Sequence, residues 1–158
     1  MAHTVLNRCK SLRGVAAVEL ALTMIPLLVL TFGVTEYGRA IYTYNTIEKA
    51  ARDAVRYLTA PTPGSSDAKA DARNLVVYGN ALGTGSPLAP GLTTAMVNIC
   101  DATTCPLTHA AVPNGSGTGV MNLVTVSISG YVYNSIVTFV APATLNFSDI
   151  SVTMRGNL

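Results

Sequence analysis

The chain has 158 residues, of which 49% are hydrophobic and 11% are charged, and its formal net charge is +2. This length suits one domain with a modest core, and the low charge content excludes a disordered tail. Because the chain has no Trp and no long run of Lys or Arg, its composition also argues against a nucleic-acid-binding protein.

The first predicted element is an apolar helix that is long enough to cross a bilayer. From Val15 to Val34 the only charged residue is Glu19. About twenty residues rising ~1.5 Å each span ~30 Å, the thickness of the hydrocarbon core. The preceding segment carries basic but no acidic residues, so the positive-inside rule keeps the N-terminus in the cytoplasm and sends the rest outward. We therefore expect a cytoplasmic basic leader over 1–14 and a transmembrane helix over 15–35.

A cleaved secretory signal is the alternative to this anchor. It requires small residues at a cleavage site behind the apolar stretch, whereas Thr35-Glu36-Tyr37-Gly38-Arg39 follows here. The apolar stretch is also longer than the usual core of a signal peptide. Both features favour a retained anchor.

The helical periodicity continues past the anchor and predicts an amphipathic helix over 36–60, continuing the stalk. We expect one helix from about Val15 to Thr59, because no strong breaker occurs before Pro61 except Pro26. Pro26 removes one backbone hydrogen bond, so a kink or local loosening is expected there. The expected packing positions are Tyr37, Ala40, Ile41, Tyr44, Ile47, Ala51, Ala54, Val55 and Leu58.

The remaining segment, 61–158, is predicted to form the extracytoplasmic part. A second, shorter helix is expected over 67–78, with Ser66 or Asp67 as its N-cap. Its packing positions should include Ala70, Leu75 and Tyr78.

Three strands are expected after a loop rich in Gly and Pro. They cover 93–100, 121–133 and 144–154, and the alternation of apolar residues changes phase near Ser148-Asp149, which predicts a turn or bulge. An antiparallel sheet with one apolar face needs a cover, and the amphipathic helix is the available partner. The predicted fold class is α+β: a long N-terminal helix, transmembrane in its first half and amphipathic in its second, packed on a small antiparallel β-sheet.

The predicted topology places the three cysteines on two sides of the membrane. Cys9 would face the reducing cytoplasm, whereas Cys100 and Cys105 would face the oxidising side and lie close enough to bridge a short loop. We predict a Cys100–Cys105 disulfide worth about 2 kcal/mol. The alternative is a metal site formed with His109, but a zinc site usually needs a fourth ligand.

Sequence motifs for catalysis are missing. The chain has no G-x-S-x-G, no phosphate-binding P-loop, no dinucleotide-binding fingerprint and no H-E-x-x-H. Its two histidines, His3 and His109, fall on opposite sides of the predicted membrane, so they cannot meet in one subunit. We expect a protein that is not an enzyme and needs no cofactor.

Glu19 is the candidate functional residue of the apolar helix. A carboxylate within a membrane segment costs several kcal/mol unless it is neutralised or paired, and such residues are usually functional. The alternative is a position at headgroup level near the cytoplasmic end of the helix, where the cost is small.

The run "RGVAAVELALTMIPLLVL" resembles the signal of type IV pilin-like proteins, in which a short basic leader ends in Gly and Glu is the fifth residue after it. Gly14 and Glu19 match that spacing. The longer run from Arg13 to Tyr57 resembles the TadE-like family of minor pseudopilins from tight-adherence (Flp-type) pilus systems. The large segment after the helix favours a minor component over the bulk subunit of the filament.

The resemblance implies that a prepilin peptidase in the membrane cleaves between Gly14 and Val15. An extended Gly14 would let the peptidase approach the backbone closely. The new amine at Val15 would lie about 6 Å along the helix from Glu19 and would compensate its charge in the same or a neighbouring subunit.

The implied location is the bacterial inner membrane, in a single pass, with possible incorporation into a pilus. The implied partners are membrane lipid, other pilins or pseudopilins, and membrane proteins of pilus assembly. The alternative is a single-pass anchored binding domain outside the cytoplasm that is never processed.

Overall fold

The computed structural model describes residues 9–115 and 119–157. The part of the predicted leader before residue 9, which includes His3, lies outside the described residues. Within them, one unit combines the chain up to Arg39 with Ser135–Ala143, and a second unit combines Ala40–Asn134 with the chain from Thr144 onward.

Helix α1, Cys9–Leu58, contributes residues to both units and includes Pro26. The prediction placed its start at Val15, but the helix begins six residues earlier. The backbone from Cys9 to Arg13 follows the helix because only Gly14 has a low helix propensity in this region. At the other end, the chain leaves the helix just before Pro61, as predicted.

The part of α1 in the second unit buries one side against the core. The predicted packing positions Ala40, Ile47 and Ala51 are buried there. The prediction was wrong for Tyr37 and Ile41, which are 50% and 61% exposed. Each lies one residue, or about 100° around the helix, from the stripe that is buried.

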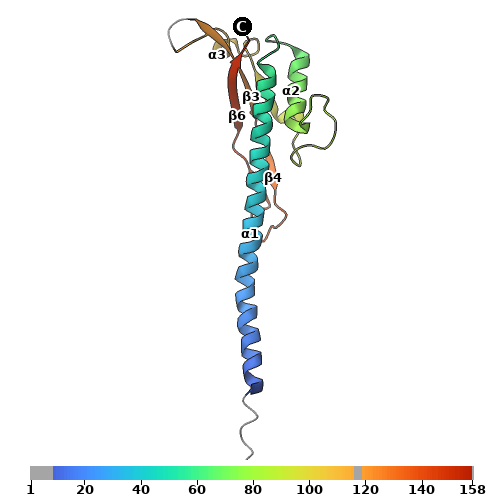
Figure 1. Cartoon of the computed structure of the whole chain (residues 1–158), viewed down its shortest axis with the longest axis vertical. Coiled ribbons are helices and arrows are strands. Elements are labelled where there is room, and N and C mark those ends of the chain that lie inside the picture. Colours follow the sequence, from blue (N-terminus) through green and yellow to red (C-terminus); the bar gives the residue numbers. More distant parts are fainter. Residues whose placement is uncertain (1–8, 116–118, 158) are drawn as a thin grey trace, which may run out of the picture. The chain divides into compact units, whose positions relative to one another are not determined.

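Helix α2, Ser66–Tyr78, confirms the predicted second helix, and Figure 1 shows it beside α1. Its N-cap is Ser65 rather than Ser66 or Asp67: the Ser65 hydroxyl accepts a hydrogen bond from the Ala68 backbone at 3.3 Å. Ala70 is exposed, contrary to the prediction. The buried side of α2 follows another stripe, formed by Ala68, Ala72, Val76 and Val77.

Four antiparallel strands form the main sheet around β3, Val120–Ile128. Strand β3 pairs with β1, Val97–Cys100, with β6, Ile150–Gly156, and with the short β2, Val112–Pro113. Residues 94–96 of the first predicted strand form a 3-10 turn, η1, Thr94–Met96, instead. A short helix that the sequence did not predict, α3, Pro106–His109, follows β1.

The prediction of one strand over 121–133 was wrong, because Gly130 interrupts it. Gly130 has a φ of 72°, a conformation that suits glycine. The chain resumes as β4, Val132–Asn134, in the opposite phase: Tyr131 and Tyr133 are buried whereas Val132 is 38% exposed.

Near Ser148-Asp149, where a turn or bulge was predicted, the chain breaks between two strands of different sheets. Strand β5, Thr144–Asn146, pairs with β4 in a two-stranded sheet, and β6 belongs to the main sheet. Phe147 lies between them and stacks on Tyr133 with 5.9 Å between the ring centroids.

The core of the second unit joins α1 and α2 to the sheet residues. The fold class is therefore α+β, with the long N-terminal helix packed on small antiparallel sheets, as predicted. Fully burying each large apolar side chain contributes about 1.5–3 kcal/mol. The largest fully buried side chains are Ile47, Val55, Val76, Val77, Leu92, Val126 and Ile128.

Candidate functional site on helix α1 and the disulfide loop

The predicted processing site lies in a regular part of α1. Gly14 is helical rather than extended, and no atom lies within 4 Å of the position where a Cβ would be. Val15 is 63% exposed, and Glu19 is exposed one turn further along. Among the described residues Glu19 forms no ion pair. Val15 and Glu19 are therefore both exposed on the same helix, while the peptide bond between Gly14 and Val15 lies within the helical backbone.

The apolar surface of α1 around these residues is bare. Twelve large hydrophobic residues between Val15 and Val34 are exposed by 41–74%. Burying them would contribute on the order of 10–20 kcal/mol, as much as the whole stability of a typical domain. Water is a poor solvent for such a surface. Among the described residues, one helix, α1, is long and apolar enough to cross a membrane.

The helix continues through Pro26 without interruption. Proline has no N–H to donate to the carbonyl of Leu22. Nearby, the Thr23 hydroxyl donates to the carbonyls of Glu19 and Leu20 at 3.1 and 3.0 Å, a bond from a side chain to the preceding turn that often bends helices. The kink at Pro26 stays a prediction.

Sequence reasoning missed the burial of Glu36, directly after the apolar run. Glu36 is 3% exposed, and its Oε1 accepts a hydrogen bond from the backbone N–H of Ile136 at 3.1 Å. A hundred residues separate the two, so no local pattern predicts this contact. The loop that carries Ile136, residues 135–143, lies beside α1 in Figure 1.

Two further contacts hold loop 135–143 to α1. The Phe139 ring meets Phe32 edge to face, with centroids 6.0 Å apart and planes at 78°. Val140 approaches Gly33 so closely that a Cβ at Gly33 would lie 3.2 Å from Val140 Cγ1. The loop is therefore fixed to the turn of α1 between Phe32 and Glu36.

The predicted disulfide between Cys100 and Cys105 is confirmed. It closes a loop of six residues, with the two Cα atoms 5.5 Å apart. Within the loop, the Cys105 backbone donates to the carbonyl of Asp101 at 2.9 Å. The disulfide thereby fixes the backbone from which the Asp101 side chain projects.

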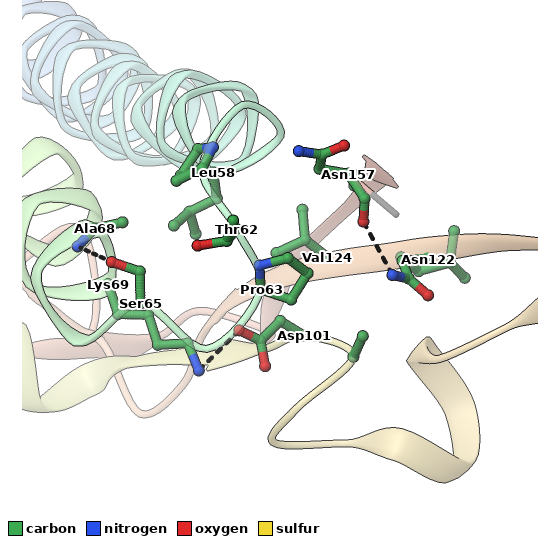
Figure 2. Close-up of a pocket in the computed structure, with 14 residues that line it drawn as sticks. Leu58, Thr62, Pro63, Ser65, Ala68, Lys69, Asp101, Asn122, Val124 and Asn157 are labelled. Carbon is green, nitrogen blue, oxygen red and sulfur yellow. Dashed lines mark hydrogen bonds and ion pairs between the residues drawn. The ribbon is translucent and has the colours of Figure 1, made fainter.

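Asp101 is the centre of a buried polar cluster that sequence reasoning did not identify as such. Its Oδ2 lies 2.8 Å from Nζ of Lys69 and accepts a hydrogen bond from the Gly64 backbone at 2.9 Å. Its Oδ1 accepts from the Thr103 and Thr104 backbones and from the Thr104 hydroxyl. Figure 2 shows the pair of Lys69 and Asp101 joining α2 to the loop after β1. Asp101 is only 6% exposed.

These contacts set the protonation of Asp101. Burial acts to raise the pKa of the carboxyl, but the hydrogen bonds from Lys69, Thr104 and Gly64 outweigh burial and hold the pKa well below its usual range. The unfolded chain therefore takes up a proton at Asp101 first as the pH falls.

Consequently, the contribution of Asp101 to stability is complete above the ordinary aspartate pKa of about 3.9 and declines as the pH falls below it. Urea unfolding of the full chain in detergent, followed by circular dichroism, measures this loss. We expect the difference in unfolding free energy between the native chain and Asp101→Asn to shrink steadily from about pH 5 towards pH 2. A difference that stays constant over this range would contradict the assigned pKa shift.

The cysteines and His109 form the one group of described residues arranged like metal ligands. Ligand atoms of Cys100, Cys105 and His109 lie within 4.8 Å of one another. In the structure, however, the two sulfur atoms are bonded to each other, whereas a metal requires free thiolates. His109 Nε2 lies 2.8 Å from the Thr125 hydroxyl, so the imidazole already has a hydrogen-bond partner.

The comparison with protein families matches one segment of the chain. Residues 14–56 match the family model described as "TadE-like protein", which confirms the predicted resemblance over that segment. The match begins at Gly14, the residue on the N-terminal side of the predicted cleavage. No curated protein and no solved structure matches the chain.

Proposed function

We propose, from the TadE-like match over residues 14–56, that this chain is a non-enzymatic minor pseudopilin that takes part in the assembly of a tight-adherence type IV pilus through α1. The observation that carries the proposal is the exposed apolar surface of α1 from Val15 to Val34, in which Glu19 is the only charged residue. Such a surface requires lipid or other helices around it.

In this proposal a prepilin peptidase removes the leader after Gly14 and leaves a free amine on Val15. The amine carries a positive charge and Glu19 a negative one, four residues apart on the helix. Inside lipid or a bundle of helices, where isolated charges are costly, each charge is best accommodated beside the other. A neighbouring subunit can supply the amine, so the pair favours one register between stacked helices.

The rest of the chain has a supporting role in this account. The second unit displays its sheets and α2 on the outside of the inner membrane, and the proposed partners are other pilins or pseudopilins and the membrane proteins of pilus assembly. Membrane lipid surrounds the free subunit.

The second candidate is an unprocessed, single-pass anchored domain that binds a partner in the envelope. The helical conformation at Gly14 favours it, because a peptidase cannot cleave a helical peptide bond without unwinding it. In this candidate the bare surface of α1 serves only to hold the protein in the membrane.

Substitution of Glu19 tests the assembly role. We expect Glu19→Ala and Glu19→Gln to remain in the membrane after an alkaline wash but to lose co-purification with the other pilus components. Glu19→Asp keeps the negative charge and should therefore retain a large part of the co-purification. The matched control is Leu22→Ala, which shortens an exposed neighbour on α1 without changing charge. Unchanged co-purification of Glu19→Gln would contradict the charge-pairing role.

A further inference from the structure

The loop of residues 135–143 is unusually apolar for an exposed connection. Its sequence, SIVTFVAPA, contains no charged residue. Ile136 and Phe139 are 73% and 70% exposed, whereas most connecting loops present polar side chains to water. Two large hydrophobic side chains exposed on one loop make it a candidate for contact with something other than water.

The conformation of the loop is defined by its own backbone. Ser135 donates to the carbonyl of Ala143 at 3.0 Å and closes the base of the loop. Val140 and Ala141 both donate to the carbonyl of Val137 at 3.2 Å and form a turn that includes Phe139. Ile136 and Phe139 are therefore exposed on an ordered turn.

The attachment to α1 fixes the height of this turn along the helix. Its contacts fall on Phe32, Gly33 and Glu36, at the point where the apolar run that begins at Val15 ends. Because the run is as long as the hydrocarbon core is thick, these contacts lie at the outer border of that core. Aromatic and aliphatic side chains at this depth are favourable, and the loop brings no charge to it.

The carboxylate of Glu36 would oppose a position of the loop at the border of the hydrocarbon core, but its hydrogen bond with Ile136 keeps it away from the surface. An exposed carboxylate two residues beyond the apolar run would keep water at the border of the membrane. Here the Glu36 side chain is buried between α1 and the loop, where its Oε1 is hydrogen-bonded. The exposed side chains of α1 just before Glu36 carry no charge, and the large apolar ones among them are Phe32 and Val34.

From these observations we propose that loop 135–143 is a membrane-interface contact, in which Ile136 and Phe139 enter the outer headgroup and acyl boundary of the lipid bilayer. The inference rests on the membrane-spanning role proposed for α1. It adds a second attachment to lipid, which restrains the rotation and depth of α1 in the bilayer. The rival occupant of the same surface is the helix of a neighbouring subunit.

A tryptophan scan tests this contact, because the chain has no Trp of its own and each introduced indole is the single reporter. The full-length protein is reconstituted, at a low protein-to-lipid ratio, in phosphatidylcholine vesicles whose acyl chains carry bromine either near the headgroup or near the bilayer centre. Three variants are compared: Phe139→Trp in the loop, Leu27→Trp in the middle of the apolar run, and Leu107→Trp in α3. The Leu107 side chain is 99% exposed in the second unit and serves as the control for a site in water.

We expect Phe139→Trp to show blue-shifted emission. Bromine near the headgroup should quench most of its fluorescence, and bromine near the bilayer centre should quench it more weakly. Leu27→Trp should be quenched most by the deep bromine, and Leu107→Trp by neither. Suppose that Leu27→Trp is quenched as expected but Phe139→Trp, like Leu107→Trp, is quenched by neither bromine and shows no blue shift. The proposed lipid contact of loop 135–143 is then wrong, whereas the membrane-spanning role of α1 is supported.

Two other results separate the remaining possibilities. Blue-shifted emission of Phe139→Trp without quenching by either bromine would place the loop against protein and overturn the lipid contact in favour of a neighbouring helix. If neither bromine quenches Leu27→Trp, the membrane-spanning role of α1 itself fails. Because Phe139 is largely exposed, the substitution leaves the described core intact, and Ile136→Trp provides an independent second reporter that should give the same depth.

Discussion

Replacing Asp101 by Ala is expected to lower the free energy of unfolding by about 3–5 kcal/mol, the cost of removing one partner of a buried ion pair. The substitution leaves the Lys69 ammonium, whose side chain is 12% exposed, without its counter-charge. It also leaves the backbone N–H groups of Gly64, Thr103 and Thr104 without their acceptor. Urea unfolding of the full chain in detergent at neutral pH, followed by circular dichroism, measures the loss.

Two matched variants sharpen this test. Lys69→Met should cost less than Asp101→Ala, because Asp101 keeps its backbone donors when only the ammonium is removed. Glu48→Ala breaks the exposed ion pair with Arg52 on α1 and should cost no more than about 0.5 kcal/mol. If Asp101→Ala were as mild as Glu48→Ala, the cluster would not be the structural link between α2 and the disulfide loop that its contacts indicate.

Gly14→Ala is expected to give the largest functional effect, loss of most of the leader cleavage. The methyl group obstructs the peptidase at the scissile bond. It also stabilises the helix at this position by about 1 kcal/mol, so that the unwound state needed for cleavage is populated roughly five-fold less. Intact-mass analysis of the membrane fraction, from cells that contain the peptidase, gives the ratio of uncut to cut chain.

The control for this prediction is Gly38→Ala. Gly38 also lies in α1, and no atom is found within 4 Å of its Cβ position, so the substitution stabilises the helix in the same way. Because Gly38 is distant from the cleavage site in sequence, its variant should be cut normally. If cleavage of the leader were impaired equally in both variants, the cause would be the general stability of the helix and not a specific role of Gly14 at the cleavage site.

The features of the fold that depend on local sequence patterns were predictable. The apolar run, the periodicity behind it and the alternation in β3 and β6 each follow from neighbouring residues. The same holds for the Cys100–Cys105 pairing, because the two cysteines are only five positions apart. By contrast, the interruption of the second predicted strand, 121–133, at Gly130 was missed, because a glycine between residues of regular alternation is compatible with both a strand and a turn.

The contacts missed at the candidate site join residues that are distant in sequence. Glu36 and Ile136 are a hundred positions apart, and Lys69 and Asp101 belong to different elements, so neither pair leaves a signal within a window of one helix or strand. One signal was available: the absence of charge from residues 135–143 marks an atypical loop. Its partner on α1 still could not be named without the structure.

The N-terminal residue of the wild-type protein, determined by intact mass and sequencing in membranes and in sheared pili, tests the central claim most directly. The pseudopilin account predicts a chain that begins at Val15 in cells with the prepilin peptidase and one that keeps the residues before Val15 in cells without it. A chain that still carries its leader within an assembled pilus would contradict the account.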